Sequence, residues 1–202
     1  MAIPPDGGSA KTIAFQYNPS TIKRALKPQM SGGEPQSRSE AVRFTGPPVQ
    51  QITIDIELNA ADGLCDGDPA VVKSGMLPQL AQLELLAYPK LSGVTSAQSK
   101  LASGVMEIAP EEAPRTLFVW GSTRVLPVAI TQYQVTEELF DNHLNPIQAN
   151  VTVTMRVLSY VDVESSNTIY ADFVTYQQNL VNLAGQVQPV SNADIGINPG
   201  SY

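Results

Sequence analysis

The chain has 202 residues, of which 43% are hydrophobic, so it is long enough for one domain with an ordinary packed core. Its 19 acidic residues outnumber its 12 basic ones, which gives a net charge of -7 at pH 7. This balance does not supply the positive field that nucleic-acid binding needs, so DNA and RNA are not expected as partners.

The sequence also bears on membranes and on the redox compartment. Its longest uncharged apolar runs, such as residues 125–130, are far shorter than the roughly 20 residues of a membrane-spanning helix. Residues 1–8 lack the basic start and the apolar stretch of a signal peptide. The single Cys65 excludes an intramolecular disulfide. We therefore expect no membrane insertion and assembly in a reducing cytoplasm.

The first third of the chain predicts strands separated by a long arm. In residues 12–26, Ile13, Phe15 and Tyr17 alternate with polar or small residues before Asn18-Pro19, which predicts two short strands in a hairpin. Residues 28–48 are rich in Gly, Pro, Ser and charge, and they predict a long loop or arm. Residues 51–59 alternate strictly between isoleucine or leucine and polar residues, so they predict a strand with one buried face.

The middle of the chain predicts one helix and one loop. Residues 69–87 follow an acidic turn at 62–68, and Asp68 is placed to cap the helix N-terminus. Apolar residues recur there at helical spacing, namely Val72, Met76, Leu80, Leu83 and Ala87. Residues 88–114 are rich in Ser, Ala, Gly and Pro without a sustained period, which predicts a mobile surface loop.

The last third returns to strands and ends in a helix. Strands are predicted over 116–121, over 124–136 with a bulge where the apolar parity shifts, and over 147–160. Residues 165–186 carry an apolar stripe at helical spacing, and residues 187–202 form a polar tail. The predicted fold is mainly β with flanking helices (α+β), as one domain over 1–186 with helices near 69–87 and 165–186.

Candidate catalytic groups are few. His143 lies in the predicted turn between two long strands, and neither it nor Cys65 has a visible triad around it, so both are interpreted as structural. Asp62, Asp66 and Asp68 offer hard oxygen ligands, but their spacing fails the calcium-loop pattern. We interpret these three as a solvated turn and a helix cap. No catalytic, cofactor-binding or metal-binding residue is therefore expected.

Two further kinds of residue are weak signals for a ligand site. The glycine-containing loops at 32–33 and 196–200 lack the following Lys-Ser/Thr of a phosphate cradle. Trp120 and the seven tyrosines are interpreted as core or interface residues, since aromatic side chains serve there more often than in ligand sites.

Two stretches of the chain resemble the tube-like proteins of contractile injection systems, which occupy the junction of inner tube and spike. The first is Phe15-Gln16-Tyr17-Asn18-Pro19-Ser20-Thr21-Ile22, similar to the aromatic-x-aromatic-Asn-Pro signature that opens that family. The second begins at Arg115 and continues through Phe118-Val119-Trp120-Gly121-Ser122, Val128-Ala129-Ile130-Thr131-Gln132-Tyr133, Glu138-Leu139-Phe140-Asp141 and Leu144-Asn145-Pro146-Ile147-Gln148-Ala149. Between them, Phe44-Thr45-Gly46-Pro47 and the strand after it match the family's spacing, so the resemblance covers most of residues 12–160.

The resemblance implies a phage tail-tube-like split β-barrel that assembles as six copies around a channel. The implied function is that of a structural hub or tube-initiator adaptor, whose hexameric ring joins the inner tube to the baseplate spike. The implied partners are other copies of the chain, the inner tube protein, the spike or hub trimer and further baseplate subunits. Many members of the family end in a LysM module, for which the residues after 186 are too few.

Three alternatives stay open at this stage. The chain could instead be the repeating inner tube subunit, or a glycan-binding module of the same particle. An enzyme such as a wall hydrolase needs carboxylates positioned in a cleft, whereas Asp55 and Glu57 occupy outward positions of a strand. We therefore expect a non-enzymatic particle component.

Overall fold

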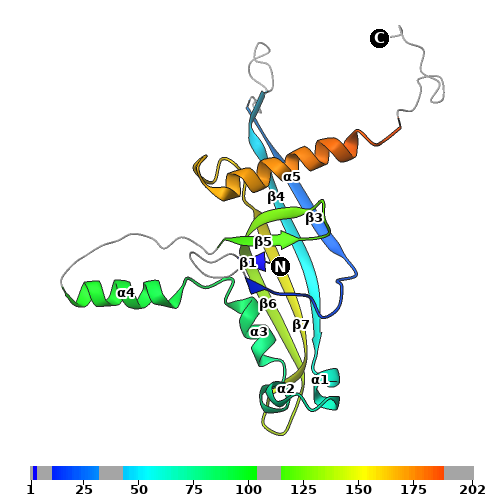
Figure 1. Cartoon of the computed structure of the whole chain (residues 1–202), viewed down its shortest axis with the longest axis vertical. Coiled ribbons are helices and arrows are strands. Elements are labelled where there is room, and N and C mark those ends of the chain that lie inside the picture. Colours follow the sequence, from blue (N-terminus) through cyan, green and yellow to red (C-terminus); the bar gives the residue numbers. More distant parts are fainter. Residues whose placement is uncertain (1, 4–10, 32–42, 104–114, 189–202) are drawn as a thin grey trace.

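The computed structural model describes residues 2–3, 11–31, 43–103 and 115–188, which form a mainly β fold with flanking helices (Figure 1). A curled antiparallel sheet makes a half-barrel, in the strand order β2-β1-β5-β6-β7-β4-β3. Its strands are β1 (Ala2–Ile3), β2 (Lys11–Thr12), β3 (Ile22–Ser31), β4 (Arg43–Asn59), β5 (Thr116–Val119), β6 (Val125–Phe140) and β7 (Pro146–Val157).

The paired strands β4 and β7 form the centre of the core. The predicted alternation over residues 51–59 is confirmed, because Ile52 and Ile54 are 0% and 1% exposed while Asp55 and Glu57 face solvent. In β7, every second residue from Ala149 to Val157 is buried in the same way. Ile54 lies opposite Val153 in the ladder, so the two apolar rows share one face of the sheet.

The bulge predicted in residues 124–136 is also confirmed. The pairing of β6 with β7 shifts register between Ile130 and Gln132, which turns the apolar residues after it from even to odd positions. Before the shift Leu126 and Val128 are buried, and after it Tyr133 packs against the core. β5 pairs with the first residues of β6, ahead of this register shift.

The predicted arm over 28–48 is wrong where the structure describes it. β3 and β4 form one long hairpin that includes residues 28–31 and 43–48, while residues 32–42 lie outside the described ranges. The ladder is irregular between Lys27 and Met30, near Pro47 and Pro48, which lack backbone donors. Sequence periodicity missed residues 27–31 of β3, a strand whose two faces are both largely exposed.

The hairpin predicted within residues 12–26 is wrong as well, although its second strand coincides with the start of β3 at residues 22–26. β2 ends at Thr12, and residues 13–21 cross to the start of β3 without forming a strand of their own. Ile13 and Phe15 still pack against the core, as their alternation suggested. The Gln16 side-chain amide accepts from Asn59 N at 2.9 Å and donates to Asn59 O at 2.7 Å. These two bonds give hydrogen-bond partners to the backbone N–H and C=O of Asn59, at the end of β4, which β3 does not reach because it begins only at Ile22.

The helix predicted over 69–87 is divided into α2 (Pro69–Ser74) and α3 (Leu77–Glu84), and α1 (Ala61–Cys65) forms within the predicted acidic turn. Asp68 caps α2 as predicted, since its carboxylate accepts from Ala70 N at 2.9 Å. Met76, Leu80 and Leu83 are buried, but Val72 and Ala87 are exposed because the chain turns at Gly75.

The loop predicted over 88–114 is wrong for residues 91–102, which form α4 (Leu91–Ala102); residues 104–114 lie outside the described ranges. Figure 1 shows α4 extending away from the body of the molecule on the side of β6. Its apolar side chains are exposed, with Leu91 at 76% and Leu101 at 61%. Periodicity failed here because the helix contains many Ser, Gly and Thr residues and hardly packs on its own chain.

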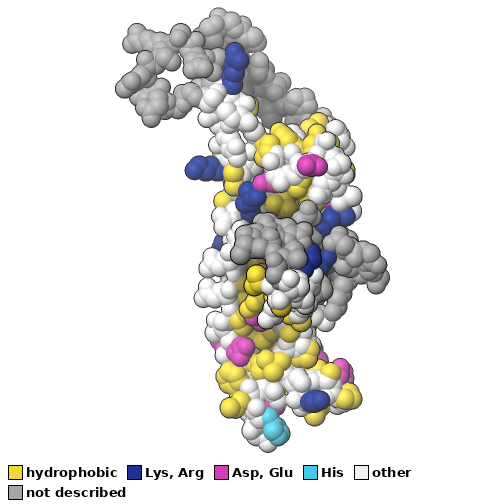
Figure 2. Space-filling model, turned by 90° about the vertical axis from the view of Figure 1, so that its left-hand side faces the viewer, with side chains coloured by type: hydrophobic (Ala, Val, Ile, Leu, Met, Phe, Trp, Pro, Cys, Tyr) yellow, Lys and Arg dark blue, Asp and Glu magenta, His cyan; other side chains and the backbone are white. Residues whose placement is uncertain are grey.

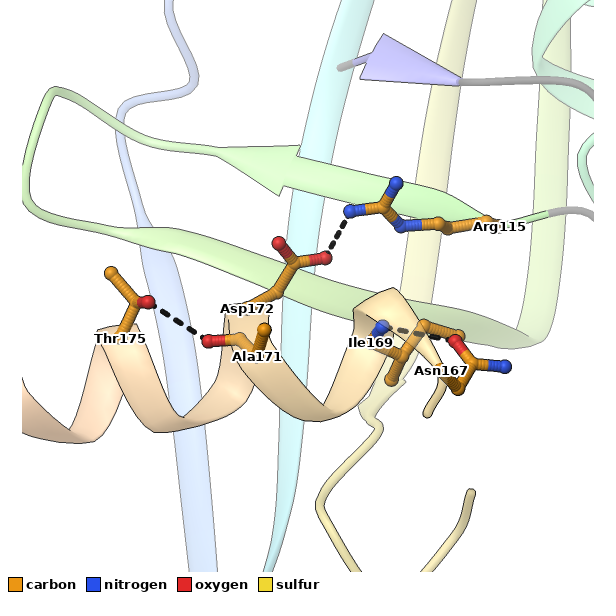
Figure 3. Close-up of polar contacts among 6 residues, drawn as sticks. All are labelled: Arg115, Asn167, Ile169, Ala171, Asp172 and Thr175. Atoms are coloured by element: carbon orange, nitrogen blue, oxygen red, sulfur yellow. Dashed lines mark hydrogen bonds and ion pairs between the residues drawn. The ribbon is translucent and has the colours of Figure 1, made fainter. Parts of the chain in front are cut away.

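The helix predicted over 165–186 is confirmed as α5 (Thr168–Ala184), which covers the core face of the upper sheet. Asn167 caps it by accepting from Ile169 N at 3.0 Å, and Asp172 forms an ion pair with Arg115 before β5 (Figure 3). On the predicted stripe Phe173 and Tyr176 are buried. The predicted tail lies outside the described ranges from residue 189 onward.

We expect Gly75→Ala to destabilise the fold far more than Gly67→Ala. Both glycines have positive φ, 54° and 67°, and an alanine in that region costs about 1 to 2 kcal/mol. At Gly75 the added Cβ would also lie 2.3 Å from Pro146 O, whereas at Gly67 it would meet nothing within 4 Å. The Gly75 variant should therefore lose roughly 2 to 5 kcal/mol of unfolding free energy.

Urea unfolding of the two variants measures this difference. Equal losses at both positions would mean that the close packing of the α2–α3 junction against β7 does not exist in solution.

Candidate subunit interface

The sheet has two strand edges that lack a partner strand among the described residues. β3 is the last strand of the sheet, and its outer edge pairs with nothing there. β6 pairs with β5 only over Val125 to Val128, so its outer edge from Ala129 to Phe140 is also open. Open edges of this length are templates for pairing with another chain.

The two edges carry opposite charge. β3 contributes Lys23, Arg24 and Lys27 and contains no acidic residue. The open part of β6 contributes Glu137 and Glu138 and contains no basic residue. All five side chains are exposed, so the edges attract one another if two copies meet. In Figure 2, which faces the β6 side, the dark blue basic side chains lie mostly in the upper half.

The exposed face of the sheet is polar across β6, β7 and β4. Opposite residues form continuous rows, for example Gln134, Thr152 and Asp55, with Thr152 Oγ1 donating to Asp55 Oδ1 at 2.7 Å. The face comprises Gln51, Thr53, Asp55, Glu57 and Asn59 from β4, Gln148, Asn150, Thr152 and Thr154 from β7, and Gln132, Gln134, Thr136 and Glu138 from β6. Helices cover the other side of the sheet, whereas these polar residues are at least partly exposed, except for the buried Thr154.

The opposite face is incompletely covered at both edges. Leu26 of β3 is 51% exposed although it shares the core face with Ile52 and Ile54. At the other edge Val135 is partly buried, and Leu139 is 64% exposed. Apolar side chains of the core face are therefore exposed at both open edges.

The predicted turn residue His143 lies in the turn between β6 and β7, as expected. Asp141 builds this turn: its carboxylate accepts from His143 N at 2.7 Å, Asn145 N at 2.8 Å and Asn145 Nδ2 at 2.9 Å. The Asn145 side chain, followed by its backbone amide, holds the pKa of Asp141 below its ordinary value. His143 itself is exposed, at the lower end of the view in Figure 2.

The other candidate residues do not come together as a site. Asp62, Asp66 and Asp68 lie in and after α1, and among the described residues no three His, Cys, Asp or Glu side chains gather as a metal site would need. Cys65 is exposed at the end of α1. The glycine loops at 32–33 and 196–200 lie outside the described ranges. Trp120 is half-buried and stacks on Phe118 with ring centroids 5.8 Å apart, so it extends the core.

A cavity of about 410 Å³ lies between residues 12–16, the end of β4 and the helices α1 to α3. Apolar side chains such as Phe15, Leu58 and Met76 form much of its wall. Its polar groups include the amides Gln16, Gln79 and Gln82, and no catalytic pair is formed by them. None of the helices in the described ranges is long and apolar enough to cross a membrane.

A comparison with known protein families found no family model that matches the chain, and a comparison with curated proteins found no similar sequence. The residues of this candidate interface were not anticipated from the sequence. Both faces of β3 are largely exposed, so its sequence shows no alternation of apolar and polar residues. The charge signal was nevertheless present, since residues 22–31 are basic and residues 132–140 are acidic.

We expect Asp141→Ala to loosen the β6–β7 turn and His143→Ala to leave it intact. Removing the carboxylate leaves the amides of His143 and Asn145 without their acceptor, so their protection from hydrogen exchange should fall about tenfold or more. In the wild type the same loss should occur at acidic pH, as the pH falls through the lowered pKa of Asp141 and the carboxylate is protonated.

Site-resolved hydrogen exchange of the three proteins tests this expectation. Unchanged protection in the Asp141 variant would show that the turn is held by other contacts.

Proposed function

We propose that this chain is a non-enzymatic structural subunit of a contractile injection system particle, in which six copies form a ring that joins the inner tube to the baseplate spike. The observation that carries the proposal is the pair of open, oppositely charged strand edges, which suits repeated head-to-tail pairing. The resemblance of residues 12–160 to tube-like proteins is the reason for proposing a contractile injection system as the particle. The ring would assemble in the cytoplasm and be carried in the particle.

Two constraints favour one register between β3 of one copy and β6 of the next: opposite charges should face each other, and the polar faces of the two strands should match. Side chains of the polar face must stay together, so each register differs from the next by two residues. The register that brings unlike charges together has Lys23 opposite Glu138 on the polar face. On the core face it places Leu26 opposite Val135. The same register brings Ile22 opposite Leu139 and Arg24 opposite Glu137, whereas a shift by two residues puts Arg24 opposite Val135 or Leu139.

This register also implies a strand tilt that a closed barrel can have. Within one chain Ile22 is level with Ile54, Val153 and Tyr133, whereas in the junction it faces Leu139, six residues further along β6. Six residues correspond to about 20 Å along a strand, and four strands span about 19 Å. The strands would therefore tilt by about 45° from the ring axis, close to the usual range for closed barrels.

In such a ring the polar face of β6, β7 and β4 would line the channel, and the helices would lie outside. Each copy would contribute β6, β7, β4 and β3, so the closed sheet is a barrel of the tail-tube type split among subunits. A lumen of Thr, Gln, Asn and acidic side chains would stay hydrated. The upper and lower ends of the ring would then contact the inner tube protein, the spike trimer and other baseplate subunits.

The closest competitor is a repeating inner tube subunit with the same ring. The projecting α4 favours the adaptor, because a tube that fits inside a sheath gains little from decoration on its outer surface. The number of copies per particle separates the two: one ring for an adaptor, and many for a tube subunit. Quantitative mass spectrometry of purified particles gives this number.

We expect Lys23→Glu/Lys27→Glu and Glu137→Lys/Glu138→Lys to block ring formation when each variant is tested alone. Each substitution puts like charges on both edges, so the assembled fraction at a fixed concentration should fall more than about tenfold. A one-to-one mixture should recover rings, because each acidic edge then meets a basic edge of the other variant. Native mass spectrometry should find the two variants alternating, with three copies of each in a ring of six.

A control is Lys73→Glu on the exposed surface of α2, which reverses one charge, half the change in each double variant, and alters neither β3 nor β6. It should assemble like the wild type, and circular dichroism should show that all variants are folded. A wild type that stays monomeric at high concentration, or a mixture without rescue, would overturn the proposed junction.

A further inference from the structure

One helix of this fold, α4, has no buried residue among its described side chains. α4 carries Leu91, Val94 and Leu101 at helical spacing, and these side chains are 76%, 48% and 61% exposed. It has twelve residues, several of them poor helix formers, and the Lys90 N-cap offers no side-chain capping bond. An isolated helix of this length and composition is marginal in water, so packing of its apolar side chains on another surface would stabilise it.

A second helix has an apolar stripe that continues past the sheet beneath it. Phe173 and Tyr176 of α5 are 6% and 3% exposed, and Tyr176 Oη accepts from Arg24 Nη2 at 2.8 Å at the β3 edge. Leu180 and Leu183 lie on the same stripe one and two turns further along, but they are 41% and 39% exposed. The core-facing side of α5 therefore extends beyond the last strand of its own sheet.

These two helices lie at opposite sides of the molecule. In Figure 1, α4 projects on the side of β6, while the C-terminal half of α5 reaches past the β3 side. α3 and α5 both pack on the core face of the sheet, and α4 follows α3 in the chain. When β6 of one copy meets β3 of the next, the two uncovered apolar stripes come to the same junction and to the same face of it.

The offset of the proposed register brings α4 of one copy and α5 of the next copy toward the same height along the strands. The neighbour whose β3 faces β6 is displaced by about 20 Å along the strands, toward the β6–β7 turn. Figure 1 shows α5 over the upper half of the sheet and α4 below it, so this displacement moves the neighbour's α5 toward α4. Their charges are compatible, since α4 contains Lys100 and no acidic residue, and the last turn of α5 contains no basic residue.

We propose that α4 is an intersubunit clamp, whose apolar stripe packs on the overhanging C-terminal half of α5 in the next copy of this chain. The inference rests on the proposed ring and adds to it a second contact on the outside of each strand junction. It explains why an exposed apolar helix exists on the β6 side at all. The clamp would cover the junction from the outside and so protect the newly paired strands from water.

The first test compares two double variants of α4. Val94→Asp/Leu101→Asp puts charge on the apolar stripe, whereas Ser96→Asp/Ser99→Asp puts the same charge on other sides of the helix. The stripe variant should raise the protein concentration needed for half-assembly at least about tenfold, since two carboxylates would be buried at each junction. The control variant should assemble like the wild type in sedimentation experiments.

A second test places the two helices together directly. In a Cys65→Ser background, Val94→Cys with Leu180→Cys should give a ladder of oxidised oligomers on non-reducing gels, and Ser96→Cys with Leu180→Cys should not. Hydrogen exchange should show α4 protected in rings and unprotected in the monomeric Lys23→Glu/Lys27→Glu variant.

The outcomes separate the clamp from the ring. Rings that form equally well with the stripe variant and yield no cross-linked ladder would overturn the clamp while leaving the proposed function intact. Protection of α4 in whole particles but not in isolated rings would assign the helix to another particle protein and also overturn the clamp. If the wild type forms no ring, the proposed function and the clamp fall together.

Discussion

The antiparallel pairing of β4 with β7 is the interaction on which the rest of the fold depends. From Gln51–Arg156 to Asn59–Gln148 the two strands keep one unbroken register, so every apolar residue falls on one face and every polar residue on the other. A single slip by one residue would exchange these faces. Because the apolar face is continuous, α3 and α5 have to pack there, and the opposite face is left polar and open to water.

Sequence reasoning succeeded where an element's partners lie within the same chain. The strand predicted over 51–59, the strand predicted over 147–160, which ends at Val157 in the structure, and the buried part of α5 have strong periodicity because each buries one face against the common core. The bulge in β6 was visible for the same reason, as a change of parity among core residues. The division of the 69–87 helix was not visible, because it depends on how closely Gly75 approaches Pro146 O, a contact between distant parts of the chain.

The elements that periodicity missed share a different property. β3 and α4 are largely exposed in the single chain, so neither has a buried face to impose a pattern on its sequence. Ordinary propensity reasoning assigns such segments to loops, since they combine Pro, Gly, Ser and charge. The candidate interface lies on these elements, and its residues were missed for that reason. In the proposed assembly, the partners of these two surfaces lie in neighbouring copies of the chain, which would explain why the sequence of one chain does not show them.

The arrangement of charge also decides what kind of assembly these edges can make. Two β3 edges would bring Lys23 and Lys27 of one copy against the same residues of another, and two β6 edges would do the same with Glu137 and Glu138. Both symmetric dimers are disfavoured by like-charge repulsion, so the remaining pairing is β3 with β6, which is head-to-tail. β3 and β6 run in opposite directions within the sheet, so this junction is antiparallel like every ladder inside the chain. In the proposed ring, each added copy would present a new β3 edge and a new β6 edge, and growth would stop only when the curled sheet closes on itself. The curl of the half-barrel would therefore determine how many copies complete the ring.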